Sequence, residues 1–226
     1  MLKRYFVTGT DTEIGKTTIA CGLLCAARRS GLTTAAAKPV AAGCERTSEG
    51  LRNEDALALQ AQCDPALAYE LINPVTLEAA IAPHIAAAEE GATLTVELLE
   101  GGCLQVFDRK ADFTLVEGAG GWRVPLNPEQ TLADLARELR VPVIMVVGMR
   151  LGCINHAILT AEAIAADGLE LAGWVANQVD PDMSRPQENL ATLKNLIKAP
   201  YLGHVPWLAD ASADLVADCL DITPLV

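Results

Sequence analysis

The residues best suited to chemistry lie near the amino terminus, where residues 9–18 read Gly-Thr-Asp-Thr-Glu-Ile-Gly-Lys-Thr-Thr. Apolar β-forming residues at 5–7 precede this stretch, and a helix-forming sequence rich in Ala, Leu and Cys follows it. A glycine-bounded loop between a strand and a helix is typical of phosphate binding, because backbone N–H groups curve around the anion and the helix start adds partial positive charge. Lys16 can reach the outer phosphates, and the Thr17 hydroxyl can ligate Mg²⁺. The stretch therefore predicts a nucleotide site.

The spacing of the glycines departs from the usual motif, in which four residues separate the first glycine from Gly-Lys-Ser/Thr. Thr10 occupies that position here, and Gly9 lies one residue earlier. We therefore expect a variant loop with a different backbone path at its start. A chance Gly-Lys-Thr at a helix start is the alternative, but the strand before it and the helix after it favour a nucleotide.

Two further charged residues stand at the ends of predicted strands. Lys38 closes a strand expected at 33–39, and Glu117 closes one expected at 113–117. Ligands bind at the carboxyl edge of open α/β sheets, so we expect Lys38 to be functional rather than a surface lysine. Glu117 precedes the glycine-rich residues 118–121, and beside a phosphate loop it suggests a second Mg²⁺ contact. Asp55, at the start of a predicted helix, reads equally as a metal ligand or as a helix-terminal acid.

Two more strand ends could bind a ligand. Asn177 closes a strand expected at 171–177, and its amide can both donate to and accept from an adenine edge. Residues 152–155 begin a helix at the same edge, where a carboxylate or phosphate could bind. An ordinary strand-to-helix loop explains residues 152–155 equally well, and the sequence leaves the two interpretations open.

Composition bounds the class of protein. The chain has 226 residues, of which 51% are hydrophobic and 4% aromatic, and we expect one domain over residues 1–226. The net charge of −12 speaks against nucleic acid or an anionic membrane as the main partner. The seven cysteines show no Cys-x-x-Cys pair and indicate reduced thiols. Since no apolar run has transmembrane length and the start leads directly into a strand, with no signal peptide, we predict a cytoplasmic protein.

Strand and helix patterns alternate along the whole chain. They predict an α/β fold of three layers, a doubly wound and mostly parallel sheet of about seven strands of the P-loop NTPase type. Six strands are clear and residues 68–75 are a possible seventh, while residues 40–53 read as a loop. The strands are expected at 5–7, 33–39, 113–117, 141–148, 171–177 and 201–207. Helices are expected at 16–29, 55–62, 83–90, 93–109, 132–140, 156–167 and 187–197. The apolar side of the helix at 93–109 would contain Leu94, Leu98, Val106 and Phe107.

Several motifs in one order resemble the dethiobiotin synthetase family. They are the loop at 9–17, Ala37-Lys-Pro-Val40, Val116-Glu-Gly-Ala-Gly-Gly-Trp122, Leu151-Gly-Cys-Ile-Asn-His156, Gly173-Trp-Val-Ala-Asn177 and Val205-Pro-Trp207. The resemblance covers nearly the whole chain and includes the longer form of the phosphate loop. It implies a ligase of biotin biosynthesis that uses ATP to carboxylate 7,8-diaminopelargonate with CO₂ and to close the ring of dethiobiotin. ADP and phosphate are the other products.

The resemblance also implies a role for each matched residue. Lys38, Lys16 and Thr12 would be catalytic. Mg²⁺ would be held by Thr17, Asp55 and Glu117. ATP would contact Glu13, Ile14, Gly15, Lys16, Thr17, Thr18, Asp55, Glu117, Gly118, Ala119, Gly120, Asn177, Val205, Pro206 and Trp207. The substrate would contact Thr12, Lys38, Ala42, Gly121, Gly152, Cys153, Ile154 and Asn155. The family is dimeric, so residues 152–155 would receive the substrate carboxylate from the partner subunit of a homodimer.

Two positions depart from the family pattern. Ala42 stands where relatives have Ser, which removes a hydroxyl near the reacting amines. Asn189 lies near a position where some relatives carry Tyr, close to the substrate carboxylate. Both departures bear on substrate affinity, and neither removes a charge that the chemistry needs.

Three other classes of protein share features with the sequence. A partition or septum-placement ATPase would carry an extra lysine early in the loop, but residues 9–14 contain none. A corrin-pathway amidotransferase would need a glutaminase domain, for which a chain ending at residue 226 leaves no room. In a non-catalytic nucleotide-binding protein, Lys38 would have no function.

Overall fold

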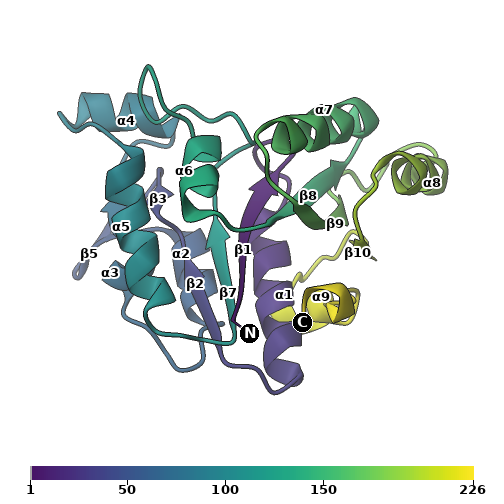
Figure 1. The fold of residues 1–226 in the computed structure, drawn as a ribbon, viewed down its shortest axis with the longest axis horizontal. Helices are drawn as coiled ribbons and strands as arrows, with labels where there is room; N and C mark the ends of the chain where they lie inside the picture. The colour runs from purple at the N-terminus through teal and green to yellow at the C-terminus, as the bar shows by residue number, and fades with distance from the viewer. Residues whose placement is uncertain (1) are drawn as a thin grey trace.

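A parallel β-sheet forms the centre of the molecule (Figure 1). The structure, a computed structural model, describes residues 2–226. In this part of the chain the central sheet has six strands in the order β10-β9-β8-β1-β7-β2. Their bounds are β1 Lys3–Gly9, β2 Thr34–Ala37, β7 Phe113–Glu117, β8 Val143–Met149, β9 Leu171–Gln178 and β10 Tyr201–Val205. The chain leaves β1 toward β2 on one side and later returns to β8 on the other, so β1 is the switch point at which such sheets bind ligands.

The strands are apolar on both faces because helices cover both faces. Successive side chains of a strand point to opposite sides. Phe6 therefore packs into one core, together with Val116 and Met145, whereas the neighbouring Val7 packs into the other core with Leu115. This double burial produces the continuous apolar runs from which the strands are predicted.

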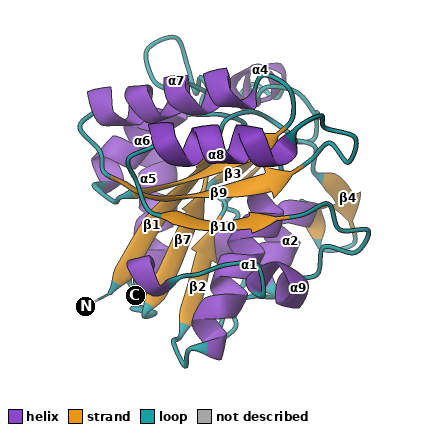
Figure 2. Ribbon diagram, turned by 90° about the vertical axis from the view of Figure 1, so that its right-hand side faces the viewer, coloured by secondary structure: helices purple, strands orange, loops and turns teal. Residues whose placement is uncertain are grey.

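The helices form the two outer layers (Figure 2). Helices α5, α6, α7 and α8 cover one face, and α1, α2 and α9 cover the other, while α3 and α4 lie on the β2 side of the molecule. The long helices are α1 Lys16–Arg29, α5 Val96–Phe107, α6 Leu132–Leu139, α7 Cys153–Ala166 and α8 Pro186–Leu196. The shorter ones are α2 Glu54–Gln60, α3 Tyr69–Ile72, α4 Pro83–Glu89, α9 Ala213–Ala217 and the 3₁₀ turn Thr223–Leu225.

The predicted fold class is confirmed, and so are most of its elements. The bounds of α1 and β7 are those expected from the sequence. The six strands of the central sheet are the six that the sequence predicts clearly, close to the expected total of about seven. None of the helices within residues 2–226 has the length and apolar character of a membrane span.

Three local predictions are wrong. The possible strand at 68–75 contains helix α3, in which Tyr69 and Ile72 are both buried at a spacing of three residues, and only Val75–Thr76 (β6) pairs, with β3. The predicted loop at 40–53 contains β3 (Val40–Ala41) and a hairpin of β4 (Glu45–Thr47) and β5 (Gly50–Arg52). Leu98, placed on the apolar side of α5, is 51% exposed. Short apolar runs carry too little periodicity to separate helix from strand.

Candidate active site

The loop between β1 and α1 has the backbone geometry that its glycines suggest. Gly15 adopts a left-handed conformation with φ of 77°, and Glu13 has φ of 55°. A Cβ atom on Gly15 would lie 2.2 Å from Nδ2 of Asn177, so only glycine fits there. The Lys16 ammonium donates a hydrogen bond back to the carbonyl of Asp11, at 3.2 Å. The side chain thus folds across the concave side of its own loop, where a phosphate group would bind.

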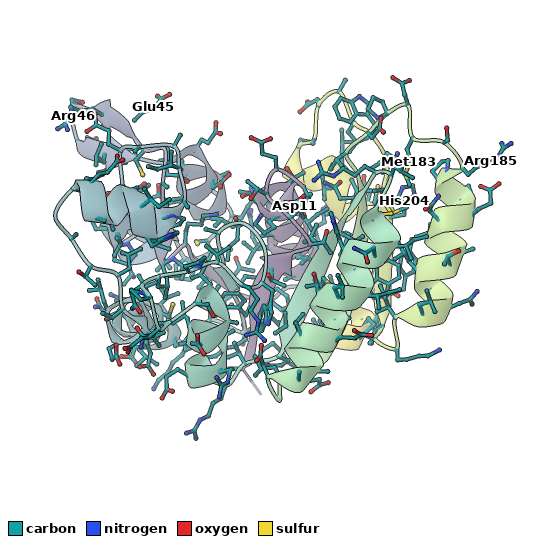
Figure 3. The ribbon with its side chains drawn as sticks, turned by 90° about the horizontal axis from the view of Figure 1, so that it is seen from above. Asp11, Glu45, Arg46, Met183, Arg185 and His204 are labelled. Atoms are coloured by element: carbon teal, nitrogen blue, oxygen red, sulfur yellow. The ribbon has the colours of Figure 1, made fainter. Side chains whose placement is uncertain are left out.

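Neighbouring strands hold the start of this loop, where its spacing departs from the usual motif. The Thr10 amide donates to Val146 O at 3.0 Å, and the Gly148 amide donates to the Thr10 hydroxyl at 3.4 Å. The Asp11 carboxylate pairs with Arg150, at the end of β8. Sequence reasoning gave neither Asp11 nor Arg150 a role, because their contact joins residues 139 positions apart. Figure 3, seen from above, shows Asp11 near the middle of the molecule.

Lys38 lies at the centre of a buried group of charges. Its ammonium donates to Glu117 Oε1 at 2.6 Å and to Asp55 Oδ2 at 3.1 Å. The Thr17 hydroxyl donates to the same Glu117 oxygen at 2.8 Å. The Lys38 and Glu117 side chains are 4% and 0% exposed, whereas Asp55 is 40% exposed and reaches toward solvent. Lys38, Glu117 and Asp55 are predicted from three separate places in the sequence, the ends of β2 and β7 and the start of α2. The fold brings their side chains into contact.

The pKa values of these groups follow from burial and charge. Burial disfavours the charged form of Lys38, but Glu117 and then Asp55 outweigh it and hold the Lys38 pKa above its ordinary value. For Asp55, burial acts against ionisation, yet Lys38 and the Thr17 hydroxyl keep its pKa below the ordinary value. Burial lowers the pKa of Lys16, and Glu117 opposes that shift only in part. The site therefore contains two ammonium groups facing two carboxylates.

An open cavity of about 860 Å³ extends from the loop to α2 and α4. It is large enough for a nucleotide and a small substrate. Eleven predicted site residues line it: Thr12, Glu13, Gly15, Lys16, Thr17, Thr18, Lys38, Ala42, Asp55, Ala119 and Gly120. Sequence reasoning missed part of the wall, formed by Asn53, Glu54, Ala80, Ile81, Ala82, Pro83, Arg123, Val124 and Pro125. Apolar residues around Pro83 carry no chemical signal in a sequence, so only the fold could have placed them here.

Other predicted site residues lie beside this cavity or away from it. Glu117 is buried beneath it, and Ile14 is buried in the core. The Asn177 amide donates to the carbonyl of Ile14 at 2.9 Å and so supports the loop. Val205 pairs in register with Asn177, which brings together two of the positions predicted for adenine. Gly118, Gly121, Pro206 and Trp207 follow the ends of β7 and β10.

The predicted substrate residues 152–155 lie outside the cavity. Gly152 precedes α7 with φ of 96°, and Cys153 is buried. The adjacent Leu151 is 94% exposed, so this end of α7 faces outward within a single chain. The structure therefore separates residues 152–155 from the residues around Lys38.

A second groove, of about 770 Å³, lies near the amino end of β8. Its charged lining residues are Glu97, Glu100, Glu129, Asp134, Glu138, Asp167 and Glu170, with Arg137 and Arg140. Such an excess of carboxylates repels a triphosphate. The cavity beside Lys16 is therefore the better nucleotide site.

Oxygen atoms that could bind a divalent cation gather beside Lys38. In residues 2–226 no three or more His, Cys, Asp or Glu side chains form a cluster able to hold a metal. Thr17, Asp55 and Glu117 nevertheless bring hard oxygen atoms together, and Glu117 Oε2 is buried without a hydrogen-bond partner. One or two carboxylates, completed by phosphate and water, form the usual Mg²⁺ site of nucleotide enzymes. The donor set fits Mg²⁺ bound together with a nucleotide.

The parallel sheet, the loop at its switch point and the paired carboxylates define a P-loop nucleotide-binding protein of the α/β class. A family model described as an AAA domain matches residues 3–214. The ATP-dependent dethiobiotin synthetase BioD of Pseudomonas paraeruginosa is 64% identical over 98% of this chain and 97% of its own. The proteins of the same name from Cellvibrio japonicus and Pseudescherichia vulneris are 62% and 51% identical, over 99% and 100% of this chain and 98% and 94% of their own. The chain belongs to the ATP-dependent dethiobiotin synthetase family.

Solved structures with low sequence identity share the fold. A ParA family ATPase from Chlorobium tepidum has a TM-score of 0.55 and 15% identity, over 96% of this chain and 91% of its own. The MinC:MinD complex of Aquifex aeolicus gives a TM-score of 0.56 at 14% identity, over 96% of this chain and 86% of that chain. At such identity the likeness shows the fold alone and does not favour a partition or septum-placement function.

Proposed function

We propose that the chain makes dethiobiotin from 7,8-diaminopelargonate, CO₂ and ATP, with Lys16 and Lys38 as its two working cations. Membership of the ATP-dependent dethiobiotin synthetase family supports the reaction. The observation that carries the assignment to this site is the buried Lys38 ammonium, which lines the same cavity as Lys16 and the phosphate loop. A buried lysine beside a phosphate site is well placed to meet a reacting anion.

The reaction needs three bonds to form in order. One amine of the substrate adds to CO₂ and loses a proton, which gives a carbamate. A carbamate oxygen then takes the γ-phosphoryl group of ATP, and the bond between that group and ADP breaks. The second amine attacks the carbamate carbon, phosphate leaves and the ring closes. Most of the catalysis is positioning and charge stabilisation, because little covalent chemistry falls to the protein.

Lys16 and Lys38 each act at a defined step of this reaction. Lys16 stabilises the outer phosphates of ATP as they gain charge. Lys38 contacts the carbamate and the phosphoryl group that moves to it, and its position over Glu117 and Asp55 keeps the ammonium charged. Thr12 borders the diamine, and the backbone of residues 118–121 lies close to the phosphates and the substrate. Asn177 and residues 205–207 contact the adenine ring.

Thr17, Asp55 and Glu117 would hold the Mg²⁺ ion that accompanies ATP. Their oxygen atoms meet around Lys38, and the unpartnered Oε2 of Glu117 would gain a ligand bond. When bound, Mg²⁺ would neutralise charge on the phosphates. The Lys38 ammonium bonds to both of these carboxylates, so it lies beside the place where the phosphates and the carbamate would meet.

We also propose a homodimer in which residues 152–155 of one subunit receive the substrate carboxylate bound in the other. The outward position of this helix start and the full exposure of Leu151 support it. In such a dimer each site takes Lys38 from one chain and Asn155 from the other. Lys38→Gln and Asn155→Ala should each keep only a small residual rate alone, and randomly mixed chains should recover about a quarter of the parent activity. No recovery after mixing would contradict a shared site.

A cytoplasmic location completes the proposal. All seven cysteines lie in the described part of the chain as free thiols, six of them buried, which suits a reducing compartment.

The direct test of the function is product formation. The purified chain is incubated with the diamine, bicarbonate and MgATP, and the cyclic urea is detected by mass. We expect dethiobiotin, ATP hydrolysis that rises with the diamine present, and loss of product in Lys38→Gln with nucleotide binding retained. Absence of the cyclic urea from the parent reaction would overturn the proposed function, and full activity of Lys38→Gln would overturn the role of Lys38.

A further inference from the structure

A buried hydroxyl group joins the two segments that carry Lys38 and Asp55. The Tyr69 hydroxyl accepts a hydrogen bond from the Asn53 amide at 2.7 Å and donates one to Asn73 Oδ1 at 2.9 Å. Asn53 caps α2, since its side chain accepts from the amide of Ala56 at 3.3 Å. Asp55 stands two residues after this cap. The hydroxyl therefore fixes the start of the helix that carries Asp55.

The other side of this network holds Lys38. The Asn73 amide nitrogen donates to the Lys38 carbonyl at 2.7 Å and to Val75 O at 3.1 Å. The Lys38 amide donates to the carbonyl of Ile72 at 2.7 Å. The backbone polar groups of Lys38 are thus bonded to Ile72, the last residue of helix α3, and to Asn73 directly after it. This arrangement sets where the Lys38 side chain begins.

Burial makes this network sensitive to the loss of one member. Tyr69, Asn73 and Asn53 are 5%, 2% and 6% exposed. The Asn73 oxygen accepts one bond and its nitrogen donates two. The Tyr69 hydroxyl donates its only proton and accepts one bond, so it has no second proton to donate elsewhere. In a buried network that is fully paired, water cannot replace a missing group cheaply.

We infer that Tyr69 and Asn73 are positioning residues for Lys38, and this inference rests on the role proposed for that lysine. Neither residue is part of the cavity wall in the described chain, so neither touches the reacting atoms. The Tyr69 hydroxyl sets the distance between the backbone of Lys38 and the start of α2. The Lys38 ammonium then lies on the phosphate loop side of the cavity, bonded to both carboxylates. Because the Lys38 side chain is only 4% exposed and its ammonium is bonded at the far end, its stem has little freedom to absorb a shift of its backbone.

Tyr69→Phe tests the inference with the smallest change. The variant keeps the ring, which lies 4.2 Å from the Arg52 guanidinium, and removes only the hydroxyl. We expect kcat to fall by about 10- to 100-fold, because a displacement of about 1 Å at a reacting group can cost that much. The KM for ATP should change much less than kcat, because the phosphate loop is untouched and Asp55 is only one of the groups proposed for MgATP.

Tyr5→Phe is the matched control. Tyr5 is 7% exposed, and its hydroxyl donates to Leu225 O at 2.7 Å, far from the cavity. This variant loses one buried hydrogen bond, whereas Tyr69→Phe loses two, and it should keep the parent kcat. An equal fall of kcat in both variants would show a general loss of packing and would overturn the inference.

A double-mutant cycle separates positioning from general stability. If Tyr69 acts through Lys38, adding Tyr69→Phe to Lys38→Gln should lower the residual rate no further. The same fold-loss in the parent and in the Lys38→Gln background would overturn the inference, because the hydroxyl would then act independently of the lysine.

The NMR signal of the Lys38 ammonium gives a measurement that does not depend on product formation. A signal that is present in the parent chain and absent from Lys38→Gln belongs to Lys38. We expect Tyr69→Phe to shift or broaden it and Tyr5→Phe to leave it unchanged. An unchanged signal in Tyr69→Phe would overturn the positioning role, whereas failure of the parent chain to form dethiobiotin would overturn only the proposed function.

Discussion

Lys38 and Glu117 form the most demanding contact at the scale of single residues, because their side chains are 4% and 0% exposed. Lys38→Met would leave the Glu117 carboxylate buried without its main cation. We expect the free energy of unfolding to fall by about 3–5 kcal/mol, the usual cost of removing one partner of a buried ion pair. Urea unfolding at neutral pH measures it. Lys198→Met, which removes an exposed lysine, should have little effect.

Mg²⁺ gives an independent check on the same pair. An ion that binds only the folded chain stabilises it, and the gain is larger where the ion binds more tightly. In Lys38→Met no ammonium competes for Glu117 and Asp55, so Mg²⁺ should raise the unfolding midpoint more than it does in the parent. Equal shifts in the two proteins would show that the metal does not use these carboxylates.

Gly15 is another residue whose substitution should be costly. Gly15→Ala adds a Cβ atom 2.2 Å from Asn177 Nδ2, at a position with φ of 77°. We expect weaker ATP binding and a loss of stability above the roughly 1–2 kcal/mol of left-handed strain. Gly31→Ala is the control, because its φ is 81° and nothing lies within 4 Å of the added atom. Calorimetric nucleotide titration should show weaker binding in Gly15→Ala only; equal affinity in both variants would contradict the clash with Asn177.

The sequence predicted the charged residues of the candidate site better than the residues that hold them in place. Lys38, Asp55 and Glu117 could be found because a charge at the end of an apolar strand or the start of a helix is visible in one stretch of sequence. Tyr69 was assigned to a possible strand, and its hydroxyl contacts depend on three segments meeting in the fold. Arg150 pairs with Asp11 across the sheet for the same reason. Contacts between distant segments leave no periodic pattern to detect.

At the scale of elements, α6 shows a cap that can be tested apart from the chemistry. The Asp134 carboxylate accepts hydrogen bonds from the Thr131 amide and hydroxyl, both at 2.8 Å. Asp134→Ala should lower the free energy of unfolding by about 1 kcal/mol and leave kcat unchanged, because the helix start loses its acceptor. Glu138→Ala, at an exposed position of the same helix, should be nearly neutral. Chemical denaturation of both variants measures these changes in the free energy of unfolding. Equal losses of stability would contradict the capping role.

The elements predicted well are those with a long, uniform pattern. Helix α1 spans 14 residues and β8 is buried at every position, so period and burial leave little choice. The hairpin at 45–52 was missed because its strands are three residues each and mostly exposed, which gives no alternation between apolar and polar residues. Figure 3 shows its residues Glu45 and Arg46 at the outer edge of the molecule. Packing against the sheet, rather than local propensity, is what made a segment predictable.

At the scale of the whole molecule, the charge distribution explains how an acidic chain can bind a triphosphate. The net charge is −12, yet in the cavity wall Lys16, Lys38 and Arg123 balance the three carboxylates of Glu13, Glu54 and Asp55. The carboxylates that line the groove near the amino end of β8 account for part of the excess. A nucleotide is therefore repelled from much of the surface and attracted only where helix α1 begins and the two ammonium groups lie.

The stability of the whole molecule should fall in acid. Hydrogen bonds from Thr33 hold the pKa of Asp112 below its ordinary value, and bonds from Thr131 do the same for Asp134 against the effect of burial. A carboxyl whose folded pKa is depressed stabilises the protein above its unfolded pKa, and this contribution is lost as pH falls through the folded value. The loss should therefore begin near pH ~4 and grow below it. Urea unfolding between neutral pH and acid measures the slope. Asp134→Asn should start from lower stability and lose less on acidification, and a slope identical to that of the parent would show that Asp134 is not a source of the acid sensitivity.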